Sequence, residues 1–294
     1  MDLLERVRAT GLLDEPVLVL LSGGRDSVCL LDVAARLTDV RALHVDYGMR
    51  EASGADAAHC AELCRRLEVP LEVHRARRPE KPGNLQAWAR DVRHGLAARS
   101  GRRVATGHTA SDQAETVLYR LASSPSRRAL LGMRPRDGRL VRPLLGVTRE
   151  ETAAHCAARG LPWREDESNA SPAFARSRVR HGLLAALREV HPGAEANVVR
   201  TAELLRDEAE VLDAVVDEVL GGCREVELER LRALPPALQR LVVRRLAEDA
   251  LGRGLPRAAR RAQDVLALPD PGALDLGDGA RARVAGGRLR FEAT

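Results

Sequence analysis

The stretch Leu20-Leu21-Ser22-Gly23-Gly24-Arg25-Asp26-Ser27 decides the fold, because it ends the apolar run 17–21 and leads into an amphipathic segment. A strand, a glycine turn and a helix are predicted in that order. The two glycines allow successive backbone N–H groups to point into one concavity, and the helix adds the positive end of its dipole. Such a turn suits a phosphate or a pyrophosphate. It is not a Walker A loop, since that loop needs a lysine after its last glycine and the only lysine of the chain is Lys81.

Asp26 inside this turn has two interpretations. An acidic side chain disfavours a bare polyanion, so either a metal ion lies between its carboxylate and the phosphates or Asp26 only caps the helix. The turn by itself therefore leaves an anion site and a plain strand-to-helix connection as alternatives.

The first half of the chain alternates short apolar runs with longer amphipathic ones. Strands are predicted at residues 17–21, 42–45, 71–74 and 104–106, with crossover helices at 26–37, 54–67 and 85–99. This order predicts an α/β fold, a Rossmann-like parallel sheet with helices on both faces. The carboxyl ends of its strands share one edge, where open α/β sheets bind ligands.

Helical signals dominate the second half. Thr148-Arg149-Glu150-Glu151 has capping-box spacing, and helices are predicted over 175–189 and 194–220. Alternation at 273–276, 280–284 and 288–291 predicts strands, with Gly286-Gly287 as a hairpin turn. We therefore divide the chain into a catalytic domain at 1–190, a linking helix at 191–220 and a smaller, mostly helical domain at 221–294.

Composition limits the class of protein. The chain has 294 residues, a formal net charge of +5 and a pI of about 9.3, which is compatible with a polyanionic partner. Two each of Trp, Tyr and Phe argue against recognition of single strands by rows of stacked bases. Five cysteines without a Cys-x-x-Cys pair predict reduced thiols and a cytoplasmic protein. No apolar run has membrane-spanning length and the amino terminus is unlike a targeting peptide, so no membrane partner is expected.

The second informative stretch is Gly107-His108-Thr109-Ala110-Ser111-Asp112-Gln113-Ala114-Glu115-Thr116. A helix that begins near Ser111 puts Asp112 and Glu115 on one face, close to its amino terminus and to His108. Two carboxylates so placed suit a Mg²⁺ ion beside the phosphates. The alternative is that acidic residues belong in any first helical turn, because the dipole favours them there.

Polar residues also follow the second strand. Asp46 and Arg50 face a nucleotide in one interpretation, with the backbone at Val45 contacting the adenine. A turn-forming Asp and a solvated Arg are the alternative.

Arginines are the remaining candidates. Arg90 and Arg93 share one helix face, while Arg176, Arg178 and Arg180 occur at every other residue. Forked guanidinium groups suit phosphate contacts. Nearly all of the 47 basic residues are arginine, however, so the alternative that these are ordinary solvent-exposed arginines stays open.

The order and spacing of these segments resemble a known family. Residues 22–27 resemble the pyrophosphate loop (PP-loop) of the N-type ATP pyrophosphatases, which adenylate a carbonyl-like oxygen and release pyrophosphate. Six further segments resemble tRNA(Ile)-lysidine synthetases: residues 44–50, 89–93, 107–116, 142–145, 161–169 and 178–181. The likeness covers about residues 15 to 215, and the chain length resembles the short form of that family.

By that resemblance the chain is a ligase that uses ATP to adenylate the C2 oxygen of the wobble cytidine in the CAU anticodon of tRNA(Ile). The ε-amine of free L-lysine then displaces AMP. The resemblance implies a PP-loop α/β domain and a small tRNA-binding domain, ATP and Mg²⁺ as cofactors, and leaves a homodimer open.

The resemblance also implies roles for individual residues. The catalytic group is Asp26, His108, Asp112, Glu115 and Arg180, of which Asp26, Asp112 and Glu115 are also the predicted Mg²⁺ ligands. The predicted ATP contacts are Ser22, Gly23, Gly24, Arg25, Asp26, Ser27, Val45, Asp46 and Arg50. The predicted tRNA contacts are Arg90, Arg93, Arg178 and Arg180.

Three positions depart from the family pattern, namely Tyr47, Thr109 and Ser111. One rival is another PP-loop tRNA-modifying enzyme, such as a tRNA cytidine thiolase, which is expected to carry a Cys-x-x-Cys pair and an iron–sulfur cluster. A catalytically silent tRNA-binding homologue is the second alternative.

Overall fold

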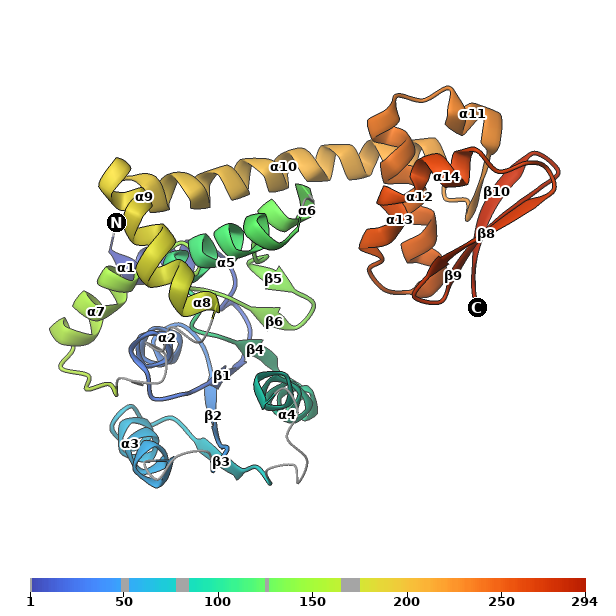
Figure 1. Ribbon diagram of the computed structural model, residues 1–294. Helices are drawn as coiled ribbons and strands as arrows, with labels where there is room; N and C mark the ends of the chain where they lie inside the picture. The colour runs from blue at the N-terminus through green and yellow to red at the C-terminus, as the bar shows by residue number, and fades with distance from the viewer. Residues whose placement is uncertain (1, 49–52, 78–84, 125–126, 165–174) are drawn as a thin grey trace. The chain divides into compact units, whose positions relative to one another are not determined.

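The computed structural model describes residues 2–48, 53–77, 85–124, 127–164 and 175–294 (Figure 1). Contacts between residues divide the chain into two compact units, Met1–Leu205 and Arg206–Thr294, and the division falls inside one long helix.

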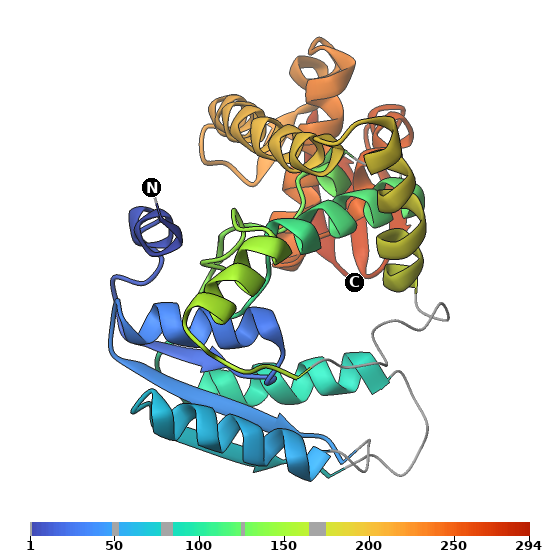
Figure 2. The ribbon, with the colours of Figure 1, turned by 90° about the vertical axis from the view of Figure 1, so that its left-hand side faces the viewer.

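A six-stranded sheet forms the centre of the first unit. Its strands are β1 (Val17–Leu20), β2 (Val40–Asp46), β3 (Leu71–Arg75), β4 (Arg103–Ala105), β5 (Arg136–Asp137) and β6 (Leu140–Val141). They lie in the order β3-β2-β1-β4-β6-β5, and every neighbouring pair is parallel except β5 with β6. The parallel course of the strands can be followed in Figure 2. The predicted parallel sheet is confirmed, but the short β5–β6 hairpin was missed.

Helices cover both faces of this sheet, as predicted (Figure 1). The elements are α1 (Leu3–Ala9), α2 (Arg25–Ala35), α3 (Ser53–Arg66), α4 (Leu85–Arg99) and α7 (Arg149–Ala158). Val17 and Val19 of β1 pack with α1, α2, α3 and α7, whereas Leu18 packs on the α4 side. β1 is an unbroken apolar run because both of its faces are buried.

Further helices extend from the carboxyl edge of the sheet. They are α5 (Ala110–Ser123), α6 (Arg127–Leu130), α8 (Ala175–Arg178), the π-helical turn η2 (Val179–Leu183), α9 (Leu184–Val190) and the first part of α10 (Ala194–Leu220). A small core joins α5 to this region, where Ala114 and Leu118 pack with Val179 and Leu184. The helix expected over 175–189 is thus present, with a π-helical turn in its middle.

The second unit combines the end of α10 with helices and an antiparallel sheet. Its other elements are β7 (Glu225–Glu227), α11 (Leu228–Arg232), α12 (Pro236–Leu251), α13 (Pro256–Arg260), α14 (Ala262–Leu266), β8 (Gly272–Gly277), β9 (Ala280–Ala285) and β10 (Arg288–Ala293). The strand order is β7-β10-β9-β8. The hairpin at Gly286-Gly287 is confirmed, since both glycines have positive φ between β9 and β10.

Across the described residues, none of the helices combines the length and apolarity needed to span a membrane.

Candidate active site

The turn after β1 is braced by its own serines and leaves the start of α2 without a side-chain cap. Gly23 has φ +81°, and Gly24 is the N-cap residue with extended backbone. The Ser27 hydroxyl donates to the Gly24 carbonyl (2.8 Å) and accepts from the Ser22 N–H (3.2 Å). The N-cap residue, a glycine, supplies no side-chain hydrogen bond to the first N–H groups of α2. Those donors, together with the helix dipole, form the anion-binding geometry expected of this turn.

The segment after β4 lies against that helix start because Gly107 has no side chain. A Cβ atom at Gly107 would lie 2.8 Å from the backbone carbonyl of Asp26 and 3.0 Å from the N of Ser27. The sequence alone did not indicate this close approach. It brings His108, the next residue, beside the first turn of α2.

His108 is held as a neutral imidazole. Its Nδ1 lies 2.8 Å from the hydroxyl of Thr106, which leaves Nε2 for another partner. Burial lowers the pKa of His108 to about 4, and nearby arginines add to the effect while Asp112 opposes it. At neutral pH the ring therefore offers a hydrogen bond without a positive charge.

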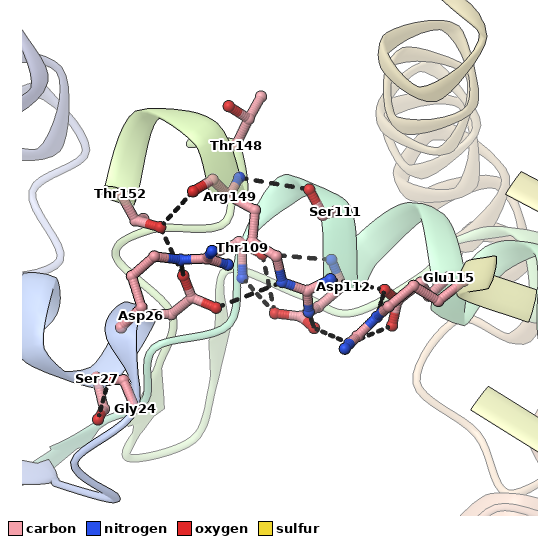
Figure 3. A network of polar contacts seen from close by, with 12 residues as sticks. Gly24, Asp26, Ser27, Thr109, Ser111, Asp112, Glu115, Thr148, Arg149 and Thr152 are labelled. Carbon is pink, nitrogen blue, oxygen red and sulfur yellow. Dashed lines mark hydrogen bonds and ion pairs between the residues drawn. The ribbon is translucent and has the colours of Figure 1, made fainter. Parts of the chain in front are cut away.

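Asp112 both caps the start of α5 and forms an ion pair in the candidate site (Figure 3). Thr109 is the N-cap of α5, and its N–H and hydroxyl both donate to Oδ2 of Asp112 at 2.9 Å. The other oxygen, Oδ1, lies 2.8 Å from Nη2 of Arg149. Burial alone would raise the pKa of Asp112, but Arg149 and the bonds from Thr109 outweigh it and leave the pKa below its usual value.

Glu115 lies one helical turn further and is completely buried. Its Oε1 contacts Nη1 of Arg149 at 3.0 Å and Nε of Arg180 at 2.6 Å, and its Oε2 lies 3.1 Å from Nη2 of Arg180. Arg180 belongs to the π-helical turn η2. Such turns occur often at functional sites, and here one carries a guanidinium that reaches α5.

Asp26 completes this group from the first turn of α2. Its Oδ1 accepts from the Thr152 hydroxyl (2.5 Å) and from Nε of Arg25 (3.1 Å), and its Oδ2 lies 3.6 Å from Nε of Arg149. The predicted carboxylates Asp26, Asp112 and Glu115 are therefore brought together, with Arg149 between them (Figure 3).

The predicted Mg²⁺ ligands thus hold a guanidinium in this structure. Within the described ranges, no group of three or more His, Cys, Asp or Glu side chains is placed to hold a metal ion. The side chains of Asp26 and Asp112 are 20% and 13% exposed, whereas that of Glu115 is 0% exposed. Asp26 and Asp112 offer partly exposed carboxylate oxygens, the ligands that a hard cation such as Mg²⁺ prefers. The buried Glu115 instead forms ion pairs with Arg149 and Arg180.

Sequence reasoning missed Arg149. It occupies the first position of α7, whose N-cap Thr148 forms a capping box with Glu151. The signal was present, because a cation in the first helical turn opposes the helix dipole and needs another partner. Burial alone would lower the pKa of Arg149, but Asp112, Glu115 and Asp26 reverse this and raise it.

The residues predicted to contact the nucleotide after β2, namely Val45, Asp46 and Arg50, differ in what the structure shows of them. Val45 is a buried residue of β2, so only its backbone is offered at the strand end. Asp46 is buried and accepts from the Gly48 N–H (2.8 Å) and from Nε of Arg75 (3.3 Å). Its carboxylate therefore shapes the turn. Arg50 lies outside the described residues.

The predicted tRNA contacts divide into two sets. Arg90 and Arg93 are exposed on α4, and Arg178 is exposed on α8. Arg180 instead turns toward Glu115 and joins the catalytic group. The two arginines that the sequence paired, Arg178 and Arg180, thus lie in different surroundings.

Comparison with known proteins gives consistent matches. A family model described as a PP-loop domain matches residues 5–187. The chain is 42% identical to a tRNA(Ile)-lysidine synthase of Gloeobacter violaceus over 81% of this chain and 78% of that protein. It is 38% identical to a tRNA(Ile)-lysidine synthase of Streptomyces coelicolor over 96% of this chain and 87% of that protein.

Among solved structures, a U34-tRNA thiolase from Methanococcus maripaludis, determined with its 4Fe-4S cluster, shares the fold. The TM-score is 0.58 at 19% identity, covering 69% of this chain and 78% of that one. A likeness at this identity supports the PP-loop fold alone.

Proposed function

Since the chain belongs to the tRNA(Ile)-lysidine synthase family of PP-loop proteins, we propose that it is the ligase that converts the wobble cytidine of a CAU anticodon to lysidine. The C2 oxygen of the cytidine attacks the α-phosphorus of ATP, and the bond to the departing pyrophosphate breaks. The ε-amine of free L-lysine then attacks C2, the C2–O bond breaks, and AMP leaves. Adenylation is needed because the C2 oxygen is otherwise a poor leaving group.

One observation carries this proposal: the uncapped start of α2 and the carboxylates of α5 meet at the same sheet edge. The free N–H groups of α2 suit the pyrophosphate. His108, neutral and fixed through Thr106, offers Nε2 to the phosphoryl group that is transferred. The adenosine would follow toward the end of β2, beside the backbone of Val45.

The amine must arrive as an ammonium and lose a proton before it attacks C2. Asp112 is the more exposed carboxylate of α5, and its low pKa keeps it charged at neutral pH. We assign it to the lysine ammonium, which would take the place that Arg149 occupies here. Glu115 and Arg180 position Arg149 and are the supporting pair.

During adenylation, Mg²⁺ would find its preferred oxygen ligands in Asp26 and Asp112, and the lysine ammonium would use Asp112 only in the second step, after pyrophosphate has left. When bound, the ion would neutralise charge on the ATP phosphates. Arg149 contacts both carboxylates in this structure, so binding of the ion requires Arg149 to withdraw.

We assign the smaller carboxyl-terminal domain, 221–294, to binding the body of the tRNA. This segment contains fourteen arginines against ten acidic residues, which suits a polyanion. A cytoplasmic site of action follows from the tRNA substrate. A homodimer stays a proposal that light scattering of the purified chain would test.

The direct experiment supplies purified protein with ATP, radiolabelled lysine and an unmodified tRNA(Ile) transcript with a CAU anticodon. Label should enter the RNA with one AMP formed per lysine, and a transcript with uridine at the wobble position should stay unlabelled. Binding of the transcript without AMP formation would instead identify a silent tRNA-binding homologue. Consumption of ATP with transfer of a different nucleophile would identify another PP-loop enzyme.

A further inference from the structure

Five arginines lie close enough to His108 or to one another to interact electrostatically, namely Arg90, Arg93, Arg120, Arg142 and Arg176. Within the described part of the chain, none of the five forms an ion pair with a carboxylate, in contrast to Arg149 and Arg180. The sequence singled out Arg90 and Arg93 as RNA contacts and offered Arg176 as a phosphate contact, and the structure adds Arg120 and Arg142 from other elements. We call these five residues the arginine cluster.

Two members are anchored by the loop before β5. Nη1 of Arg142 donates to the carbonyl of Arg134 at 2.6 Å, and Nη1 of Arg120 donates to the carbonyl of Gly132 at 2.8 Å. Backbone carbonyls fix the direction of a guanidinium but leave its charge uncompensated. Both arginines therefore keep N–H donors and a full charge for another partner.

Arg176 is anchored from the opposite side. Its Nη2 donates to the hydroxyl of Thr116 at 3.0 Å. Thr116 and Arg120 are four residues apart on α5 and so lie on the same helix face. Arg176 of α8 is thus held beside Arg120 by an uncharged hydroxyl, which leaves its charge uncompensated.

Arg142 is the member that most requires an anion. It is 7% exposed, and its Nε is buried with no hydrogen-bond partner among the residues that the structure describes. Burial lowers its pKa, Arg90 and Arg120 add to the effect, and Asp137 opposes it. A buried cation with an unused donor is costly unless a charged ligand meets it.

The position of the cluster indicates which anion it meets. The PP-loop follows β1, His108 follows β4, and Arg142 directly follows β6, the next strand along. Val141 pairs with Ala105, so Arg142 stands level with Thr106, the residue that holds His108. Arg142 therefore lies across His108 from the PP-loop, at the strand end farthest from β2 and the predicted adenosine, whereas Arg90 and Arg93 reach Arg142 and His108 from α4.

We propose that the arginine cluster, with Arg142 at its centre, binds a backbone phosphate of the RNA next to the nucleotide that is modified. This assignment rests on the proposed function and adds Arg120, Arg142 and Arg176 to the substrate contacts. Guanidinium forks match phosphate oxygens in pairs, and RNA that is recognised in a loop presents such phosphates. A phosphate held on this side would present the cytidine to His108 while the PP-loop holds ATP.

The test measures RNA affinity, which does not depend on catalysis. Arg93→Gln and Arg176→Gln should each weaken binding of the tRNA transcript about tenfold at low salt. Each should also reduce the slope of log K against log salt by about one. ATP affinity measured without RNA should stay unchanged. Arg99→Gln is the matched control, because Arg99 is exposed at the other end of α4.

Arg142→Lys provides a second variant, because it keeps the charge and removes only the fork. It should weaken RNA binding, whereas equal affinity would overturn the central role of Arg142. Salt slopes for Arg93→Gln and Arg176→Gln equal to that of Arg99→Gln would overturn the cluster as a phosphate site. Loss of ATP affinity with RNA affinity intact would also overturn it, in favour of a nucleotide site. If wild-type protein shows the salt slopes but transfers no lysine, the proposed function fails while the phosphate site stands.

Discussion

Two helices begin at neighbouring strand ends of the sheet, and their first turns are built in opposite ways. α2 starts at Gly24 without a side-chain cap, whereas α5 starts at Thr109 with a complete capping box. Both have an aspartate in the first turn, Asp26 and Asp112. The difference lies in what each helix leaves for a ligand.

The uncapped helix α2 offers its first N–H groups to a ligand, whereas the capped helix α5 offers one carboxylate oxygen of Asp112. In α5, Oδ2 of Asp112 satisfies the backbone and Oδ1 reaches Arg149. In α2 the first N–H groups receive no bond from the N-cap residue and are the hydrogen-bond donors for an anion. A pyrophosphate and an ammonium need these opposite charges side by side, so the contrast matches a reaction that uses both.

The largest effect is expected when the charge of α5 is removed but its cap is kept. Asp112→Asn retains an oxygen that can accept from Thr109, so the cap of α5 is kept, while loss of the ion pair with Arg149 should lower the free energy of unfolding. Lysine incorporation should fall about 100-fold or more, because the amine loses its carboxylate. Glu150→Gln, at an exposed acidic residue in the first turn of α7, is the control and should keep normal incorporation. Near-normal turnover in Asp112→Asn would reduce this carboxylate to a helix cap.

The difference between the two helix starts can also be removed by giving α2 a side-chain cap at Gly24. The backbone of Gly24 is extended, and a Cβ there meets only Ser22 Oγ at 3.4 Å and the Arg164 carbonyl at 3.9 Å. Gly24→Asp should leave stability unchanged or raise it by a few tenths of a kcal/mol. ATP affinity should fall about tenfold or more, because the carboxylate occupies and repels the anion site. Gly24→Asn caps without charge and should lose less, and equal ATP affinity for Gly24→Asp would contradict an anion site at α2.

Much of this contrast could be predicted from the sequence. Glycine pairs, strand lengths and the position of acids in a first turn are local, so residues 22–27 and 107–116 indicated both helix starts and their shared edge. β5 and β6 were missed because strands of two residues show no alternation. Asp46 was predicted as a nucleotide contact, but whether its oxygens face a ligand or Gly48 and Arg75 depends on the folded turn.

The partners of the arginines could not be predicted in this way. Nearly all of the 47 basic residues are arginine, so composition does not separate Arg149, which pairs with three carboxylates, from Arg142, which pairs with none in the described residues. That separation depends on packing between segments far apart in the chain. The local signal at Arg149 was its place in a first helical turn.

An intermediate effect is expected where the two helix starts touch. Gly107→Ala adds a Cβ at 2.8 Å from the Asp26 carbonyl, so the segments must separate. We expect a loss of about 1 to 3 kcal/mol in the free energy of unfolding and a fall in AMP formation. Gly95→Ala is the matched control, because nothing lies within 4 Å of its added Cβ inside α4. It should raise stability by about 0.5 to 1 kcal/mol. Equal behaviour of the two variants would show that the close approach at Gly107 is unimportant.

The effect that is smallest at neutral pH, and develops only as the pH falls, concerns His108, which lies between the two helix starts. Burial lowers its pKa to about 4 in the folded chain, whereas an unfolded histidine titrates near about 6.5. As the pH falls from about 6.5 to about 4, the unfolded chain takes up a proton that the folded chain refuses, so this residue contributes less stability. Urea unfolding of wild type and His108→Gln across this range should show wild type losing stability relative to the variant. Other titrating groups are common to both proteins and cancel in the difference. Parallel curves would mean that His108 is not held neutral by the fold, and the neutral hydrogen bond assigned to it beside the PP-loop would lose its basis.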